Sequence, residues 1–259
     1  MGMNFEDFSK RESKLIITIS HLSSVLKDTN SKRHINLGLS NRFFMLKIAR
    51  NKIIQIIQEQ NDTPLDFENA SWLKLLLNSY YINLRGALDN LAWFINYEFR
   101  LQENIIEEAG KGNSFSFTDL FGKEFSVKLK NIKQTLAEEL EKRKDWYNDL
   151  KKFRDPAAHR IPLAFIQGIV TESESHKLKG LISERENINK EFSKGDFSKL
   201  DEAIKNQNDF SKLGRFQPII ITSQGSKYEF NSAPQQIDKD HKEFICVTEV
   251  IIDQILKDK

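Results

Sequence analysis

The sequence contains one cysteine, Cys246, among 259 residues, so it cannot form an intrachain disulfide framework. A chain of this kind is expected in a reducing compartment. No stretch approaches 18 uninterrupted apolar residues, and Met1–Asp7 lack a basic region followed by an apolar one. We therefore expect a cytoplasmic protein with no secretory signal, no membrane-spanning helix and no membrane partner.

Several catalytic signatures are also missing. The five histidines are dispersed without the pair spacing of metal ligands, at His21, His34, His159, His176 and His241. No glycine elbow surrounds a serine, Cys246 lies in an apolar helical pattern, and no phosphate loop or dinucleotide fingerprint is present. These absences disfavour a metalloenzyme and a serine or cysteine hydrolase, and they predict neither a metal nor a cofactor.

Most of the chain carries apolar residues at helical spacing. With 39% hydrophobic and 29% charged residues, it has enough apolar side chains for one large core, which predicts a single domain over residues 1–259. An all-α bundle is therefore predicted. Its helices are expected over residues 4–26, 38–60, 66–101, 125–153 and 234–256, with a polar break at 27–34 and a kink at Gly86.

A smaller part of the sequence departs from this helical pattern. Residues 161–170 are apolar with a proline near the start, which favours a short edge strand, and residues 217–231 resemble a hairpin with Gly225 in its turn. Between them, residues 171–216 are rich in charges of both signs. We expect an insertion with one or two surface helices, or with disorder, and a small β element before the last helix.

Arg154-Asp155-Pro156-Ala157-Ala158-His159-Arg160 is the most informative segment. Asp155 suits a helix N-cap and Pro156 the first helical position, so we expect one helix to end at Phe153 and a new turn to follow. In that geometry Arg154 and His159 would touch. An arginine can hold a phosphate and a histidine can transfer a proton near neutral pH. The structural alternative is an Arg154–Asp155 ion pair, with His159 packed on Pro162.

The stretch that leads into this segment and includes it is locally basic. Seven positive residues against three negative ones give 142–160 a net charge of +4, whereas the whole chain carries +2. A solvated helix face is the ordinary explanation for such a run. The alternative is an RNA approach path. The candidate RNA-binding residues are Arg143, Lys151, Lys152 and Arg160.

Two segments together resemble the HEPN superfamily of helical bundles: residues 83–93, Asn-Leu-Arg-Gly-Ala-Leu-Asp-Asn-Leu-Ala-Trp, and Arg154 to His159. The ribonucleases of that family carry an arginine, usually followed by a polar residue, and then a histidine after four to six positions. Here the polar residue is Asp155 and four residues intervene. Pro156 within the motif is a departure. The resemblance covers roughly residues 38–165 and the last helix.

The resemblance implies a metal-independent endoribonuclease, in a toxin or phage-defence setting, that acts as a homodimer with two motifs facing one cleft. Arg154 would stabilise phosphoryl charge, and His159 would serve as general base or acid in 2'-hydroxyl attack on the phosphodiester. Asp155 and Asp89 would support these two residues, although capping and an Arg85–Asp89 ion pair are the structural alternatives. The expected partners are RNA, a second copy, and an antitoxin or nucleotidyltransferase-like protein.

A different class of function remains open. Some proteins of the same family are catalytically silent, so the bundle could bind a nucleotide, an RNA or a protein without turning it over. The presence of both Arg154 and His159 counts against this alternative.

Overall fold

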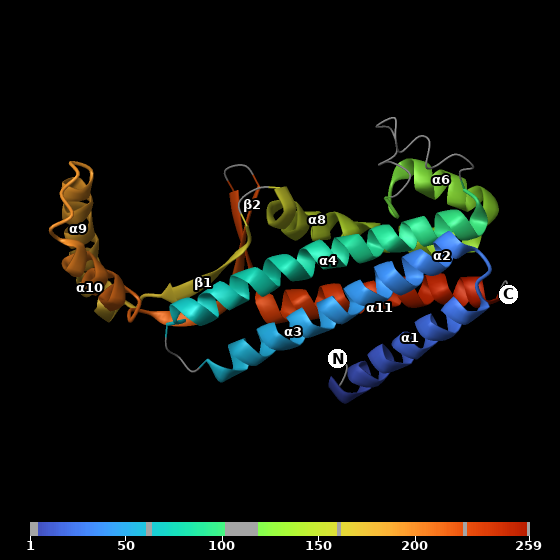
Figure 1. The fold of residues 1–259 in the computed structure, drawn as a ribbon, viewed down its shortest axis with the longest axis horizontal. Coiled ribbons are helices and arrows are strands. Elements are labelled where there is room, and N and C mark those ends of the chain that lie inside the picture. Colours follow the sequence, from blue (N-terminus) through green and yellow to red (C-terminus); the bar gives the residue numbers. More distant parts are fainter. Residues whose placement is uncertain (1–4, 61–63, 102–118, 160–161, 225–226, 258–259) are drawn as a thin grey trace.

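The computed structural model describes residues 5–60, 64–101, 119–159, 162–224 and 227–257. Long helices lie side by side in one bundle (Figure 1). They are α1 (Phe5–Val25), α3 (Asn41–Glu59), α4 (Phe67–Phe99) and α11 (Ala233–Lys257). Helix α3 packs along α4, and α1 packs on α11. The predicted helical fold with a small antiparallel sheet before the last helix is confirmed.

Helix α4 forms as its sequence predicts. Asp66 caps its first turn by accepting a hydrogen bond from the backbone N–H of Asn69 at 2.7 Å. Apolar residues every three or four positions then face the core, and the helix ends at Phe99, followed by the C-cap residue Arg100, whose φ is +48°. The helix continues through Gly86 without interruption from Phe67 to Phe99.

The segment before α3 is more helical than predicted. Helix α2 (Thr29–Arg33) and the π-helix η1 (His34–Ser40) lead directly into α3, so the polar break at 27–34 is wrong for most of its length. Asp28 explains the early start, since its side chain accepts from the N–H of Ser31 at 2.8 Å. Burial of Ile35 and Leu39 then holds the π-helix on the core.

The single helix expected over 125–153 is also wrong, because this region is divided into three helices. They are α6 (Lys123–Ile132), α7 (Gln134–Glu141) and α8 (Lys144–His159). Lys133 has φ −139°, outside the helical range, and turns the chain between α6 and α7. Each of the three helices is amphipathic, so the apolar pattern continues across breaks that it does not reveal.

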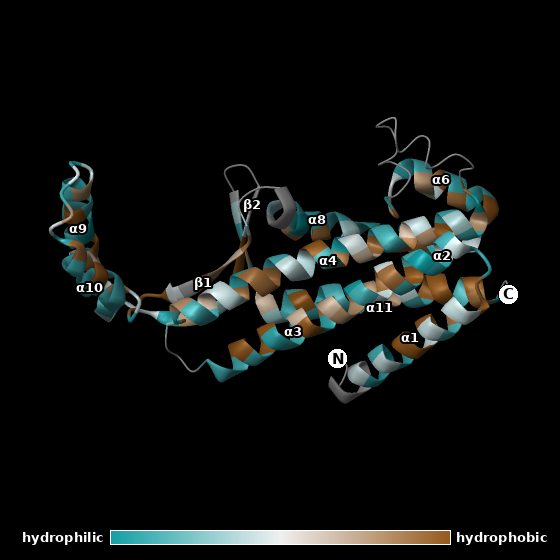
Figure 2. Cartoon of the chain, in the orientation of Figure 1, coloured by the Kyte–Doolittle hydropathy of each residue, from teal (hydrophilic) through white to brown (hydrophobic). Residues whose placement is uncertain are grey.

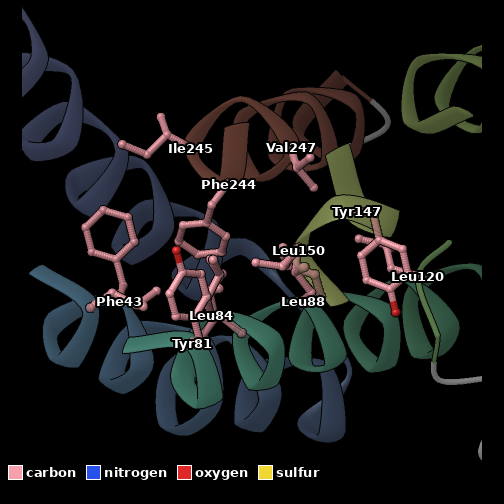
Figure 3. Close-up of a cluster of buried hydrophobic side chains, with 14 of the residues drawn as sticks. Phe43, Tyr81, Leu84, Leu88, Leu120, Tyr147, Leu150, Phe244, Ile245 and Val247 are labelled. Carbon is pink, nitrogen blue, oxygen red and sulfur yellow. The ribbon is translucent and has the colours of Figure 1, made fainter. Parts of the chain in front are cut away.

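The large buried side chains come from several of these helices. Figure 3 shows Phe43 of α3, Tyr81 and Leu84 of α4, and Phe244 of α11 among them. Further along, Leu88 of α4 lies beside Leu150 of α8, which joins α8 to the bundle (Figure 3). The core therefore fixes α8 against α4. Among the described helices, none is long and apolar enough to cross a membrane.

The sheet lies at one end of the bundle. It consists of β1 (Ala164–Ile169), β2 (Arg215–Gln224) and β3 (Lys227–Ser232), antiparallel in the order β1-β2-β3. Phe165, Phe216 and Ile220 are buried on the bundle side. The predicted strand and hairpin are confirmed, whereas the predicted turn residue Gly225 lies outside the described residues.

The charged insertion is helical. After the short η3 (Glu172–Glu174), α9 (Ser175–Phe192) and α10 (Leu200–Phe210) pack on each other as an antiparallel pair. This pair, which we call the arm, extends away from the bundle (Figure 1) and is largely hydrophilic (Figure 2). The prediction of surface helices is confirmed over the alternative of disorder.

Candidate functional site

Helix α8 carries the Arg154 to His159 motif, and it does not break where the sequence predicted. The helix continues through Pro156 to His159, so Asp155 is not an N-cap and no new turn starts there. Proline removes one helical hydrogen bond and disfavours the helical conformation of the residue before it. Packing outweighs this cost: Phe153 stacks on Tyr81 with ring centroids 5.0 Å apart, and Pro156, three residues later, is also buried.

The continuous helix changes the relation between the motif residues. Five positions apart, Arg154 and His159 are separated by about 140° around the axis and about 7.5 Å along it. The backbone therefore does not bring Arg154 and His159 together in the way that the sequence predicted. Asp155 and His159, four positions apart, share one face instead. The side chain of His159 and all of Arg160 lie outside the described residues.

Arg154 lines a pocket of about 270 Å³ between α4, α8 and the segment that precedes α6. We call it the Arg154 pocket. Its lining residues are Arg85, Asp119, Tyr147, Leu150, Lys151, Arg154 and Asp155. Three cationic side chains thus meet two carboxylates, which leaves the lining with a net charge of +1.

The two arginines of the pocket already have partners. Arg154 Nη1 lies 2.7 Å from Asp155 Oδ1, and both side chains are partly exposed. Arg85 pairs with Asp89 at 3.0 Å, the intrahelical ion pair that the sequence suggested, and with Asp119 at 3.5 Å. An incoming anion would therefore exchange with a carboxylate.

Tyr147 organises the floor of the pocket. Its hydroxyl donates to Asp119 Oδ1 at 2.7 Å. The Arg85 guanidinium lies 5.0 Å from the centre of its ring, and the Lys151 ammonium lies 4.8 Å from it. Both distances suit cation–π attraction. Tyr147 thus keeps the guanidinium of Arg85 and the ammonium of Lys151 close to each other at the Arg154 pocket.

Asp89 links the two segments that carry the family resemblance. Burial raises the pKa of Asp89, and the positive charges of Arg85 and Arg154 oppose that rise. The carboxylate on α4 is therefore close enough to sense Arg154 on α8. Of the two predicted supporting residues, Asp155 pairs with Arg154 directly, whereas Asp89 pairs with Arg85.

The candidate RNA-binding residues do not gather on one surface. Lys151 lines the Arg154 pocket. Lys152 pairs with Asp149 at 3.4 Å and with Glu229 of β3 at 3.6 Å, whereas Arg143 pairs with Glu243 of α11. Much of the basic run is therefore neutralised locally, and of the candidate residues that the structure describes, Lys151 alone joins Arg154 at the pocket.

Comparison with protein-family models, curated proteins and solved structures gives no match.

Sequence reasoning missed Tyr147 and Asp119. Tyr147 lies seven positions before Arg154, and that spacing places both on one face of a helix. This spacing could be seen in the sequence, but Tyr147 also fits the apolar stripe of the helix. Asp119 gives no signal, because it comes from a non-helical segment that only the tertiary fold brings to the pocket.

The described cationic side chains of the Arg154 pocket are suited to anion binding. Within the ranges that the structure describes, no group of three or more histidine, cysteine, aspartate or glutamate side chains could hold a metal ion. Arg85, Lys151 and Arg154 are instead suited to phosphate oxygens. The backbone of the same helix places His159 one helical turn beyond Asp155.

Proposed function

We propose that the protein is a metal-independent endoribonuclease whose active site is the Arg154 pocket. One observation carries the proposal: Arg154 shares a partly buried pocket with Arg85 and Lys151, and the same helix bears His159 one turn beyond Asp155. This arrangement combines phosphate-binding cations with a proton-transfer group. The resemblance of the motif to HEPN ribonucleases supports it.

In this mechanism a phosphate of the RNA displaces Asp155 from Arg154, and the guanidinium binds two phosphoryl oxygens. A base removes the proton of the ribose 2'-hydroxyl, and the 2'-oxygen forms a bond to phosphorus while the bond to the 5'-oxygen breaks. An acid returns a proton to the 5'-oxygen. The products are a 2',3'-cyclic phosphate and a 5'-hydroxyl.

His159 supplies one of the two proton transfers. Asp155 would position it, since residues four apart on a helix are neighbours. The second transfer calls for another titratable group, and in the proposed homodimer the His159 of the second copy provides it. An antitoxin or nucleotidyltransferase-like partner would act by covering this cleft, and a toxin or phage-defence role is part of the proposal.

The test is cleavage of a structured and an unstructured RNA in excess EDTA. We expect the wild type to cleave and to leave cyclic-phosphate ends, and Arg154→Ala and His159→Ala each to lose about 100-fold or more. His176→Ala and Arg185→Ala are matched controls, because both residues are exposed on the arm. Equal activity in all five proteins would place the cleavage elsewhere and overturn the proposal.

A second candidate is a silent module that binds RNA, a nucleotide or a protein. The pairing of Arg85 and Arg154 with carboxylates favours it, because a paired pocket resembles a structural network. Its signature would be RNA binding that depends on Arg154, without cleavage and without any effect of His159→Ala. Growth arrest on expression that His159→Ala abolishes would favour the nuclease.

A further inference from the structure

The arm carries an apolar face that nothing in the described part of this chain covers. Asn206 of α10 donates to the backbone oxygen of Leu181 at 3.0 Å, and this contact sets the register of the two helices. Antiparallel packing in that register places Ile182 of α9 beside Ile204 of α10. Leu200 lies one turn along from Ile204 on the same side. These three side chains are 41%, 53% and 52% exposed, respectively.

The sheet has a second uncovered apolar face. In β3, Tyr228 and Phe230 are 68% and 64% exposed, and they lie on one side of the strand because side chains alternate. Phe230 stands opposite Ile221 of β2, which belongs to the same side. Glu229 points the other way and pairs with Lys152 of α8. The sheet therefore packs one face on the bundle and leaves an apolar face open.

Helices packed on a sheet are an ordinary two-layer arrangement, so these two faces complement each other. In this chain they do not meet: the arm lies apart from the sheet (Figure 1), and the main packing partners of α9 and α10 are each other and η3. Among the described elements the arm carries the complementary apolar face, so we consider as the cover for the sheet the chain's own arm, after a movement, and the arm of another copy.

Contacts at the base of the arm oppose a movement of the arm onto the chain's own sheet. Glu174 accepts from the hydroxyl and the backbone N–H of Thr171, at 2.7 and 3.1 Å, and also from the N–H of Gly214 at 3.4 Å. Gly214 has φ +82°, and a Cβ there would lie 2.9 Å from the carbonyl of Ile169. The two strands that lead into the arm are thus closely packed and joined at its base, which disfavours a swing of the arm onto the chain's own sheet.

We propose that two copies exchange arms: the Ile182–Leu200–Ile204 face of each arm covers the Ile221–Tyr228–Phe230 face of the other copy's sheet. Such a contact is reciprocal, so it closes as a symmetric dimer. The five most exposed of these side chains offer on the order of 500 Å² of apolar surface per copy. With a polar rim, this approaches the roughly 800 Å² per partner of a stable interface.

The arm contact is proposed as the one that holds the homodimer together. It does not depend on the ribonuclease assignment, and its test uses no RNA. Sedimentation velocity of the full chain is measured for the wild type, Ile204→Glu on the arm and Phe230→Glu on the sheet. We expect a wild-type dimer and two monomers. Ile48→Glu, a change at an exposed isoleucine of α3, is the control and should remain dimeric. Far-UV circular dichroism verifies that each variant is folded.

Mixing the two monomeric variants gives the decisive result. The Phe230→Glu copy retains an intact arm and the Ile204→Glu copy retains an intact sheet, so one of the two contacts can form. We expect dimers to reappear, more weakly than in the wild type. Monomers in the mixture, or a wild type that is itself monomeric, would overturn the proposal.

Crosslinking distinguishes contact of the sheet with the arm of a second copy from contact with the chain's own arm. In the double variant Ile204→Cys/Phe230→Cys, oxidation should give a covalent dimer on a non-reducing gel, whereas an intramolecular crosslink would overturn the exchange. If Phe230→Glu instead weakens RNA binding and leaves the oligomeric state unchanged, the sheet face binds nucleic acid and the proposal fails.

Discussion

Asn90 occupies the space where Gly38 would carry a side chain. A Cβ at residue 38 would lie 2.0 Å from Asn90 Oδ1, so η1 and α4 approach closely at this point. Asn90 cannot easily withdraw, because its Nδ2 donates to the oxygen of Gly86 at 2.7 Å and its Oδ1 lies 3.2 Å from His34 Nδ1. The glycine is therefore required by packing.

Gly38→Ala should lower the free energy of unfolding by about 1–3 kcal/mol, the usual cost of overpacking. Urea denaturation measures it. Gly180→Ala is the matched control, because Gly180 lies in α9 and a Cβ added there would meet no neighbouring group within 4 Å. That change should stabilise the protein by about 0.5–1 kcal/mol through helix propensity. Equal effects of the two substitutions would contradict the packing argument.

The buried pair of Glu12 and His241 predicts loss of stability in acid. His241 Nε2 lies 2.7 Å from Glu12 Oε1. Burial lowers the pKa of His241. For Glu12, burial raises the pKa, but the hydrogen bond with His241 and nearby cations outweigh it, so the pKa of Glu12 is also lowered. Both groups thus bind protons less readily when the chain is folded.

Stability should therefore fall as the pH falls, first below about 6.5 from His241 and then below about 4.5 from Glu12. Unfolding in urea between pH 8 and pH 5 tests the first part. His241→Gln should be less stable than the wild type at pH 8 and should show a shallower pH dependence. The same slope in both proteins would assign the acid sensitivity to other groups.

The fold was largely predictable because its helices carry strong apolar periodicity. Leu73, Leu77 and Leu84 of α4 are buried as their spacing requires. Helix boundaries were less accessible, since they depend on local details such as the Asp28 cap and the non-helical Lys133. A continuous apolar stripe does not record such breaks.

The candidate site was only partly predictable. Arg154 and Asp89 were identified from their segments, and the structure places Arg85, the ion-pair partner of Asp89, in the same pocket as Arg154. Pro156 predicted a helix start from local preference, but burial beside the core kept α8 helical. Asp119 reaches the pocket through tertiary packing alone. The residue types and their local spacing identified candidate residues in the sequence. Their relative positions depend on tertiary packing, which the sequence pattern does not reveal.

Asp240 should be a major stabilising residue of the core. Its Oδ1 accepts from Trp146 Nε1 at 3.0 Å, and its Oδ2 accepts from the Tyr81 hydroxyl and Gln236 Nε2, both at 3.0 Å. It thus joins α4, α8 and α11. Asp240→Asn keeps the shape but turns an N–H₂ group toward these donors, so we expect a loss of about 1–3 kcal/mol.

Thermal or urea unfolding measures this loss. Asp253→Asn, at an exposed position of the same helix, should change stability by less than about 0.5 kcal/mol. A similarly small effect at Asp240 would show that its three hydrogen bonds contribute little.

Removing the charge of Asp155 should separate phosphate binding from catalysis. Asp155→Asn frees Arg154 from its ion pair and takes a negative charge out of the Arg154 pocket. An exposed pair of this kind is worth up to about 1 kcal/mol, so affinity for a short RNA should rise about two- to fivefold at low salt. The gain should shrink as the salt concentration rises, because ions screen the charge. Fluorescence anisotropy with labelled RNA measures both effects.

If Asp155 also positions His159, the same variant should cleave bound RNA more slowly, and its pH–rate profile should shift to lower pH, because the carboxylate no longer stabilises the imidazolium. Asp209→Asn is the matched control, since Asp209 pairs with Lys212 on the arm at 3.6 Å. It should change neither binding nor cleavage. Weaker RNA binding by Asp155→Asn would mean that the carboxylate holds Arg154 in its binding geometry, and that phosphate does not replace it.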